Sequence, residues 1–394
     1  METVVNLKSV AKFDHCFGCG VCTAVCPQHA ISMELNTQGF FSPVVNKDCT
    51  QCSLCLNICA FNAKAELSFD LPLRVFAGWS KREDIRDNST SGGVIFELCS
   101  EYIDRGYKVC AVRYNYENSR AEHFVFDSID DLYLATGSKY IQSYSANALS
   151  SIDWAQGKYV IVGTPCMISS VRKLARMHKA EDRMLLIDFF CHGVPSYLMW
   201  QKYLQHVQGL VGEIRHISWR NKDNGWQEST AMKARGDKGR YLSFLSNGDL
   251  FFEFFLRDRC LNDCCYDHCV FKQTHSHADI RVGDLWSRRI DYLNNRLGIN
   301  SILIRSPKGL EALTMCRNIY IEEEKLSKVL GTQILANPPR SESYKFVSRE
   351  LQGELPLMRI HKRATRIERL HNLFSWSFYK NRFLYSKLRL KLGI

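Results

Sequence analysis

The sequence predicts an α+β protein, with a small cysteine-rich module at the N-terminus followed by a larger mixed α/β body. Eight of the seventeen cysteines lie in the first 60 residues, in two copies of one spacing. From about residue 74, short runs of β-branched and apolar residues, such as YVIVG at 159–163, alternate with segments of helical periodicity. With 394 residues, the chain is long enough for two or three domains.

Two cysteine runs define the N-terminal module, CFGCGVCTAVCP at 16–27 and CTQCSLCLNICA at 49–60. Both have the spacing C-x2-C-x2-C-x3-C. A zinc site holds four ligands around one ion, usually as two separated C-x2-C pairs, and does not use a third cysteine at this spacing. A 4Fe-4S cluster takes three thiolates from such a loop and a fourth from elsewhere. Residues 1–65 are therefore predicted to be a bacterial-type ferredoxin module with two 4Fe-4S clusters; zinc or a degenerate site is the alternative.

The ligands of the two clusters are predicted to cross, because in two-cluster ferredoxins the fourth cysteine of each run binds the other cluster. One cluster is assigned to Cys16, Cys19, Cys22 and Cys59. The other is assigned to Cys49, Cys52, Cys55 and Cys26. Pro27 follows the first run but Ala60 follows the second, which removes a turn-forming residue and no ligand. Gly18 and Gly20 are expected to let backbone N–H groups approach the cluster sulfides.

Composition and charge predict a cytoplasmic protein. The first residues lack a basic region followed by an apolar run, and no apolar run approaches the roughly 20 residues of a membrane-spanning helix. In a reducing compartment, clustered cysteines are metal ligands or catalytic groups rather than disulfides. The net charge of +11 comes mostly from residues 358–394, which hold ten Lys or Arg and a single acid. Because the body itself is nearly neutral, no nucleic-acid partner is predicted.

Two polar turns in the body are candidate cofactor sites. In NSTSGGVIFELCSEYIDRG, Ser91, Gly92 and Gly93 precede a segment of helical periodicity. Hydroxyls and glycines at a helix N-terminus can cradle an anion or cofactor, and an ordinary N-cap is the alternative. In ATGSKYIQS, Lys139 follows Gly137. This lysine could neutralise a phosphate or a reduced flavin, or it could be a solvated loop residue.

The remaining cysteines fall into two classes. Cys166 in VGTPC and Cys191 in FFCHG each follow a predicted strand, where ligands gather in α/β sheets, whereas Cys99 and Cys110 are predicted core residues. The segment RCLNDCCYDHCVFKQTHSHADIRVGDLW adds Cys260, Cys264, Cys265 and Cys269. Two interpretations stay open: a third cluster that also uses Cys166 or Cys191, or a zinc site completed by His268, His275 or His277.

The body resembles the family of coenzyme F420 hydrogenase/dehydrogenase beta subunits, here with a ferredoxin module at the N-terminus. The motifs that carry the resemblance are, in order, TSGG, GSKY, VGTPC, FFCHG, the cysteines at 260–269, and ADIRVGD before GINSILIRSPKG. The resemblance covers residues 1–310. It implies that residues 74–155 and 156–310 are the N- and C-terminal parts of the family domain. Residues 311–394 would then form a helical, basic C-terminal extension.

The resemblance implies an iron–sulfur flavoprotein oxidoreductase in which FAD exchanges a hydride with coenzyme F420 or another substrate. Many bacterial members resemble companions of polysaccharide pyruvyl transferases, so polysaccharide biosynthesis is the implied pathway. The implied flavin-binding residues are Ser91, Gly92, Gly93, Ser138, Lys139 and Tyr140. The implied further cluster ligands are Cys166, Cys191, Cys265 and Cys269, with Cys264 as an extra neighbour that leaves the choice within the pair open. No catalytic residue is assigned.

Partners are predicted on two levels. The protein exchanges electrons with a redox partner protein or with a small-molecule hydride donor or acceptor; the alternative is a non-catalytic electron-transfer subunit that reduces a partner enzyme. Residues 358–394 combine positive charge with Leu, Phe, Trp and Tyr every few positions. This composition fits a helix packed on the body, a docking site for an acidic redox partner, or peripheral contact with the inner face of a membrane.

Overall fold

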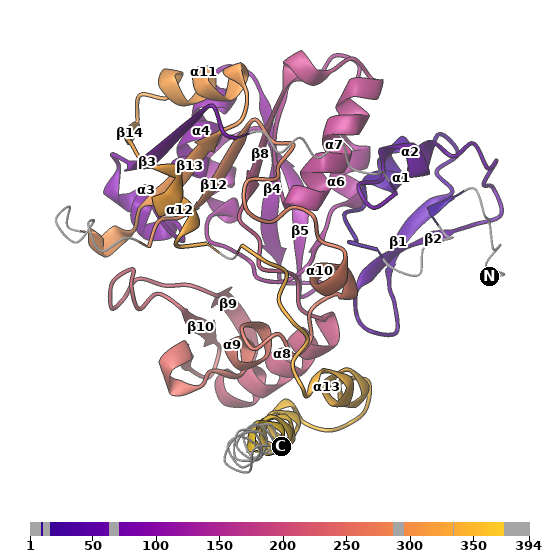
Figure 1. Ribbon diagram of the computed structural model, residues 1–394, viewed down its shortest axis with the longest axis vertical. Helices are drawn as coiled ribbons and strands as arrows, with labels where there is room; N and C mark the ends of the chain where they lie inside the picture. Colours follow the sequence, from indigo (N-terminus) through magenta and orange to yellow (C-terminus); the bar gives the residue numbers. More distant parts are fainter. Residues whose placement is uncertain (1–8, 11–15, 63–70, 287–294, 334, 374–394) are drawn as a thin grey trace, which may run out of the picture.

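The computed structural model describes residues 9–10, 16–62, 71–286, 295–333 and 335–373. Figure 1 shows a small N-terminal module beside a body built round one large sheet, with a second, smaller sheet below it. The predicted arrangement of a small module followed by a mixed α/β body is confirmed.

The N-terminal module folds its two cysteine runs in the same way. Helices α1 (Val21–Val25) and α2 (Leu54–Ile58) each contain the third cysteine of a run and are followed at once by the fourth. Each helix begins after a residue in the left-handed region, Gly20 with φ 70° and Ser53 with φ 64°. Strands β1 (Ile31–Leu35) and β2 (Phe41–Val45) pair antiparallel between the runs. The duplicated spacing thus produces a duplicated loop and helix.

The large sheet has nine strands in the order β14-β3-β13-β12-β8-β7-β4-β5-β6. Their bounds are β3 (Arg74–Ser80), β4 (Lys108–Asn115), β5 (Arg120–Phe126), β6 (Ser143–Tyr144), β7 (Tyr159–Gly163), β8 (Met184–Phe189), β12 (Ile280–Asp284), β13 (Asn300–Ile304) and β14 (Ile319–Glu323). Strands β4, β7, β8 and β12 are parallel neighbours, and β13 and β3 follow antiparallel in turn. The carboxyl ends of β3, β4, β7, β8 and β12 therefore share one edge, called the carboxyl edge below.

Residues along the central strands alternate between two cores, as the two-residue period of a strand requires. Val160 and Val162 of β7 pack with α4 (Val94–Asp104) and α11 (Pro307–Met315) on one face. Ile161 packs on the other face with α7 (Pro165–Met177) and with apolar residues of the N-terminal module. The module and the body thus share a core. Cys99 and Cys110 are at most 1% exposed, which confirms them as core residues.

The smaller sheet lies below the carboxyl edge in Figure 1. It pairs β9 (Ile214–Ser218), β10 (Ala231–Gly236) and β11 (Arg240–Phe244) antiparallel. Helices α8 (Tyr197–Val211), α9 (Leu250–Phe255) and α10 (Asp263–Asp267) accompany it. The remaining helices are α3 (Glu83–Asn88), α5 (Ile129–Leu132), α6 (Ala146–Ser150), α12 (Leu326–Leu330) and α13 (Tyr344–Leu351).

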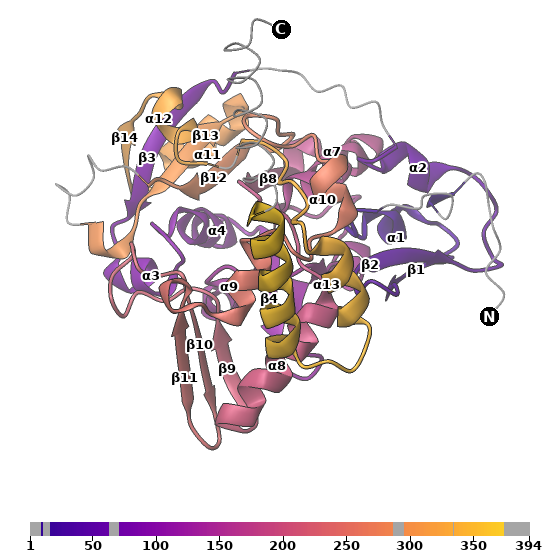
Figure 2. The ribbon, with the colours of Figure 1, turned by 60° about the horizontal axis from the view of Figure 1, so that its bottom comes forward.

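The end of the described chain is only partly a separate extension. Strand β14 pairs with β3, so the packed body continues beyond residue 310. The helical extension was predicted to begin directly after that residue. Residues 357–373 form a further helix, the C-terminal helix, which lies beside α13 (Figure 2). Residues 374–394, the rest of the predicted basic segment, lie outside the described residues. No helix in the described ranges is long and apolar enough to cross a membrane.

Candidate functional site

The cysteines assigned to the first cluster, Cys16, Cys19, Cys22 and Cys59, come together in the structure and are called the first crossed set below. Burial, followed by the charges of neighbouring thiolates that include Cys59, raises the pKa of Cys16 to about 12. The pKa of Cys19 rises to about 11, again from burial first and the charge of Cys59 second. Cys22 also has a raised pKa, from burial and then from Cys19, Cys16 and Cys59. Cys59 of the second run therefore lies beside the three thiols of the first.

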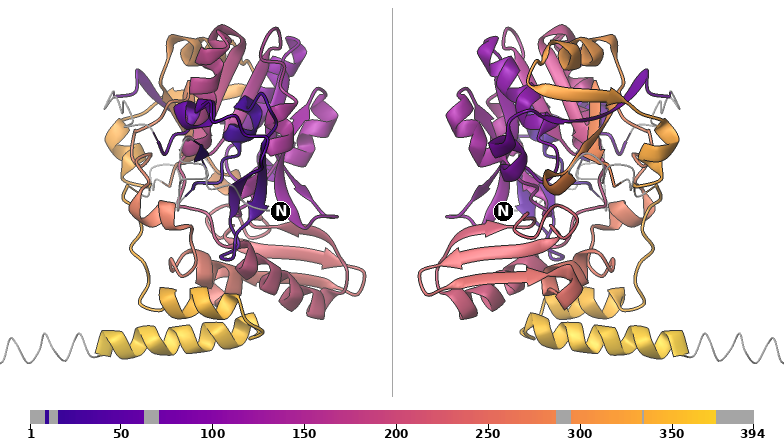
Figure 3. Two further views of the ribbon diagram at one scale, coloured as in Figure 1. Left: turned by 90° about the vertical axis from the view of Figure 1, so that its right-hand side faces the viewer. Right: turned by 90° about the vertical axis from the view of Figure 1, so that its left-hand side faces the viewer.

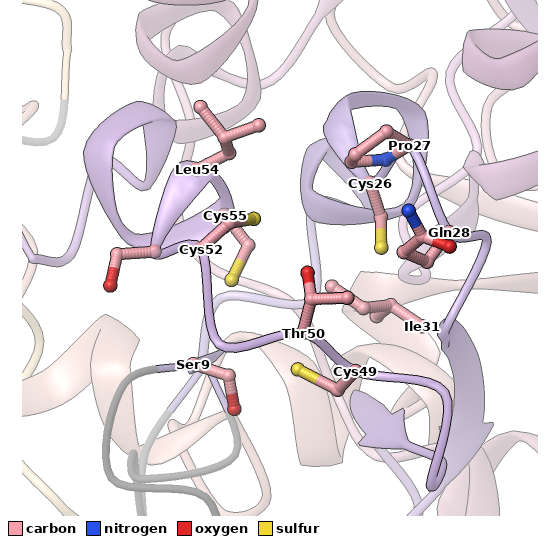
Figure 4. A pocket seen from close by; sticks show the side chains of 11 residues that line it. Ser9, Cys26, Pro27, Gln28, Ile31, Cys49, Thr50, Cys52, Leu54 and Cys55 are labelled. Atoms are coloured by element: carbon pink, nitrogen blue, oxygen red, sulfur yellow. The ribbon is translucent and has the colours of Figure 1, made fainter.

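The cysteines assigned to the second cluster, called the second crossed set, line a pocket (Figure 4). Its walls include Cys49, Cys52 and Cys55 from the second run and Cys26 from the first. Pro27, Gln28, Ile31, Thr50 and Leu54 complete the rim together with Ser9 and Ser53. Both crossed sets therefore have the chain arrangement that a two-cluster ferredoxin requires.

Gly18 and Gly20, which are predicted to let backbone N–H groups approach the cluster sulfides, have a structural role in the fold. Both have positive φ, 69° and 70°, which favours glycine. A Cβ on Gly18 would overlap the Gln142 side chain, and one on Gly20 would overlap the Ser145 hydroxyl. Ser145 donates a 2.6 Å hydrogen bond to the Cys19 carbonyl. These glycines therefore let the first cysteine loop approach the body closely.

A third group of thiols lies at the carboxyl edge. Cys166 is in the first turn of α7 after β7, Cys191 follows β8, and Cys265 and Cys269 belong to α10 and the residues after it. Burial raises the pKa of Cys166, and the charges of Cys19, Cys191 and Cys269 raise it further. For Cys265 the causes are burial and then the charges of Cys191 and Cys269. The two strand ends and the α10 segment thus bring these four cysteines together.

Cys264, the residue before Cys265, faces the first crossed set rather than Cys191. Burial raises the pKa of Cys264, and the largest charge acting on it is that of Cys16, with Cys59 also contributing. Cys264 therefore lies toward the first crossed set, whereas Cys265 faces Cys191. This separates two residues that the sequence could not distinguish.

The three histidines of the zinc alternative each make a contact within the protein. Within the described ranges, no three His, Cys, Asp or Glu side chains are grouped as ligands of a single ion. A cubane binds each thiolate to a different iron, so its ligands lie further apart than those of one zinc ion. His268 packs edge-on against Phe61, His277 pairs with the Ser169 hydroxyl, and His275 contacts the Val270 carbonyl.

Two cationic side chains, Lys272 and Arg281, lie near Cys191, and sequence patterns did not identify them. The Lys272 ammonium donates hydrogen bonds to the carbonyls of Cys191 at 2.7 Å and His192 at 2.9 Å. Arg281, fully buried, forms a 2.8 Å ion pair with the equally buried Asp188 of β8. Since Lys272 and Cys191 are 81 residues apart, no local spacing could have revealed the contact.

The three predicted cofactor residues before α4 are occupied by contacts within the protein. The Ser91 hydroxyl donates to the Ile299 carbonyl at 2.7 Å. A Cβ on Gly92 would lie 2.8 Å from the Gly78 carbonyl oxygen, so this glycine is required by strand packing. Gly93 is the N-cap of α4 in a left-handed conformation, and the Asn300 side chain accepts the first helical N–H. The first N–H group of α4 is thus already occupied by a side chain of β13.

Ser138 and Lys139 also bond inward. The N–H of Ser138 donates to the Thr90 hydroxyl at 2.7 Å. The Lys139 ammonium donates to the carbonyls of Val112, Leu134 and Thr136 at 2.8 to 3.3 Å. Burial lowers the pKa of Lys139 to about 7. The alternative of a solvated loop lysine is therefore wrong, and the ammonium holds the turn together.

Tyr140 is the predicted flavin residue that faces the carboxyl edge. Its ring stacks on Phe255 at 5.5 Å, and its hydroxyl accepts a 3.1 Å hydrogen bond from Arg220. Arg220 also pairs with Asp284, the last residue of β12, and lies over the ring of Trp286. Arg220, which no sequence motif marks, thus joins the turn that holds Tyr140 to the end of β12.

A second group of cations and rings lies next to Arg220. Trp286 stacks on Trp226 with ring centroids 4.1 Å apart. The Lys222 ammonium donates to the carbonyls of Arg86, Ser91 and Leu297, and burial lowers its pKa to about 7. Among the described residues, the buried Nε of Arg86 and Nε1 of Trp226 have no hydrogen-bond partner. Buried donors without partners, cations and exposed aromatic surface are features that suit an anionic, aromatic cofactor.

Comparisons with known proteins agree with this organisation. Residues 15–63 match the model of a 4Fe-4S dicluster domain. Residues 75–150 and 156–329 match the models of the N- and C-terminal domains of the coenzyme F420 hydrogenase/dehydrogenase beta subunit.

Two individual proteins are similar over most of the chain. A subunit of the F(420)H(2) dehydrogenase of Methanosarcina mazei is 24% identical over 329 residues, which are 79% of this chain and 85% of the relative. A chain in a xenon-derivatised structure of the F420-reducing NiFe hydrogenase complex from Methanosarcina barkeri aligns with a TM-score of 0.44 and 13% identity, covering 76% of this chain and 91% of that one. The predicted resemblance is confirmed by the family models: the chain belongs to the family of coenzyme F420 hydrogenase/dehydrogenase beta subunits and carries an N-terminal 4Fe-4S dicluster domain.

Proposed function

We propose that this protein is an iron–sulfur flavoprotein oxidoreductase that passes electrons between its ferredoxin module and a hydride-exchange site at the carboxyl edge. Its hydride partner is coenzyme F420 or another small molecule. The observation that carries the proposal is the convergence of Cys166, Cys191, Cys265 and Cys269 next to the first crossed set of cysteines. Raised pKa values keep Cys166, Cys191 and Cys265 protonated in the absence of a metal, and a metal centre that takes up thiolate charge would account for gathering these cysteines in one place.

The three thiol groups follow one another through the protein. The charge of Cys55 contributes to the raised pKa of Cys22, which links the second crossed set to the first. The charge of Cys19 acts on Cys166, which links the first crossed set to the third group. Three 4Fe-4S centres bound in this order would form a route from the module to the carboxyl edge.

The carboxyl edge suits a flavin, through Tyr140 together with residues that the sequence did not indicate. A bound FAD would accept a hydride as two electrons and release them one at a time to the clusters. Tyr140 and Trp286 provide aromatic side chains there, held by the buried Arg220, and Arg86 and Trp226 provide buried donors without partners among the described residues. Ser91, Gly92, Gly93, Ser138 and Lys139 would support the site by holding its loops.

The second candidate is an electron-transfer subunit with no small-molecule substrate of its own, which reduces a partner protein. The similar protein of Methanosarcina mazei is named as one subunit of a dehydrogenase, and this favours a protein partner. A place in polysaccharide biosynthesis stays a prediction from the family resemblance alone.

Anaerobic purification and reconstitution test both candidates. Three cubanes predict about twelve irons per chain and two predict about eight, whereas zinc without iron would refute the central claim. A yellow compound released by heat denaturation, identified as FAD by chromatography, would support the hydride site. Reoxidation of the reduced flavin on titration with F420 would identify the substrate. Iron without any flavin after reconstitution would instead favour the electron-transfer subunit.

A further inference from the structure

The outward face of the C-terminal helix is a stripe of positive charge. Seven exposed residues recur at helical spacing on this face, which we call the basic stripe: Arg359, Lys362, Arg363, Arg366, Arg369, Leu370 and Leu373. None of its five cations forms an ion pair with another described residue. The stripe contains no acid, so its charge is not compensated locally.

The only acid of the C-terminal helix lies on the opposite face and fixes the orientation of the stripe. Glu368 accepts a 2.7 Å hydrogen bond from Nε of Arg259, whose side chain is fully buried. The Ser343 hydroxyl donates a second 2.7 Å bond to the same carboxylate. Ile360 and Ala364 are fully buried on this inner face. The helix therefore cannot rotate its cations toward the body without breaking a buried ion pair.

The helix is also the outermost element on its side of the molecule. Both side views in Figure 3 show it at the foot of the protein, beyond α13 and the smaller sheet. A broad, flat partner could therefore contact the whole stripe at once without meeting another element first.

We propose that the basic stripe docks the protein on an anionic membrane surface. Leu370 and Leu373 are 44% and 63% exposed within the stripe, and leucine side chains gain free energy by entering the headgroup boundary. The sequence that follows, residues 374–394, adds five Lys or Arg, no acid, and Phe, Trp, Tyr or Leu at ten positions. Cations attract anionic headgroups, and interleaved aromatic and aliphatic residues suit the interface between headgroups and acyl chains. An RNA or an acidic protein would use the cations but would not require this apolar content.

Flotation of the purified full-length protein with vesicles tests the proposal. We expect the protein to float with phosphatidylglycerol-rich vesicles at low salt. With vesicles of pure phosphatidylcholine, we expect it to stay unbound in the dense bottom fraction. Replacing three stripe cations, R359Q, R363Q and R366Q, should lower the partition coefficient by about a hundredfold, since each interfacial cation contributes severalfold. A second variant, L370S and L373S, should weaken binding at high salt, where screening leaves the apolar contribution.

A matched control removes the same charge elsewhere. Arg235, Lys238 and Arg240 lie on or near the β10–β11 turn and are exposed, so R235Q, K238Q and R240Q should float like the native protein. Unchanged iron content and circular dichroism would show that each variant is folded. Equal flotation of the stripe and control variants would overturn the proposal. Retention of the native protein by RNA or by an acidic polymer, with no flotation on anionic vesicles, would assign the stripe to that partner instead.

Discussion

The Ser170 hydroxyl on α7 accepts a 2.9 Å hydrogen bond from the backbone N–H of Ala60, the residue directly after Cys59. Ser170 is fully buried, and its hydroxyl also lies 4.0 Å from the Cys19 sulfur. In the first cysteine run this position is Pro27, which has no N–H to donate. The difference between the two runs therefore has a structural reason: Ala60 ties the second run to the body.

This relationship predicts that restoring the proline will weaken the protein. Both A60P and S170A should lower the free energy of unfolding by about 1–3 kcal/mol, because each leaves a buried polar group unpaired or removes the contact. The expected measurement is an earlier urea midpoint for iron release under anaerobic conditions. S32A, which changes an exposed serine in the same module, should behave like the native protein. Stability of A60P equal to the native value would show that the contact does not secure the module.

The adjacent cysteines of α10 should differ in their effect on iron content. Cys265 faces Cys191, whereas Cys264 faces the first crossed set. If Cys265 is the ligand, C265S should lose the third centre, with a fall of about four irons per chain. C264S serves as the neighbouring control and should retain all iron. Iron analysis together with electron paramagnetic resonance of the reduced protein checks both variants. The opposite result, loss in C264S alone, would contradict the assignment.

The sequence predicted the parts of the site that depend on local spacing. The two cysteine runs specify their own loops and helices, and Cys166 and Cys191 follow strands that the apolar runs predict. What it missed depends on contacts between distant residues, such as Arg220 with Tyr140, 80 positions apart. Gly92 shows the opposite case: the sequence predicts that this glycine helps to cradle a cofactor, whereas strands β3 and β13 fill the space beside it.

Lys139 should make stability depend on pH. Burial lowers its pKa from 10.5 to about 7, so between these values the folded state binds fewer protons than the unfolded chain. The free energy of unfolding should therefore rise with pH across this window, by up to about 1.4 kcal/mol per pH unit. Below the folded pKa both states are protonated and the slope disappears.

The variant K139M isolates this contribution. The native protein should gain stability relative to K139M as the pH is raised from 7 to 9, because titrating groups common to both proteins cancel in the difference. Urea unfolding at each pH provides the measurement. A difference that stays constant with pH would show that the ammonium keeps its proton in the fold, stabilised by its three carbonyl acceptors.

Lys272 should raise the reduction potential of the third centre. Burial raises the pKa of Cys191, and the charge of Lys272 is the largest influence that opposes it, so this cation stabilises negative charge at the site. Adding an electron to a cluster adds negative charge, and a fixed neighbouring cation makes that step more favourable. In K272M the ratio of reduced to oxidised third centre at a fixed potential should fall about tenfold, which equals a shift of about 59 mV for one electron.

Two controls separate the charge of Lys272 from its packing. K272R keeps the charge and should keep the potential near its native value. Lys308 also donates to two carbonyls, those of Glu181 and Met184, but at the opposite end of β8. K308M should therefore leave the potential unchanged while removing a similar set of hydrogen bonds. Redox titration followed by electron paramagnetic resonance resolves the third centre from the other two. Equal shifts of the potential in K272M and K308M would mean that the change reflects general loosening of the body. An unchanged potential in K272M would show that the charge of Lys272 does not influence the third centre.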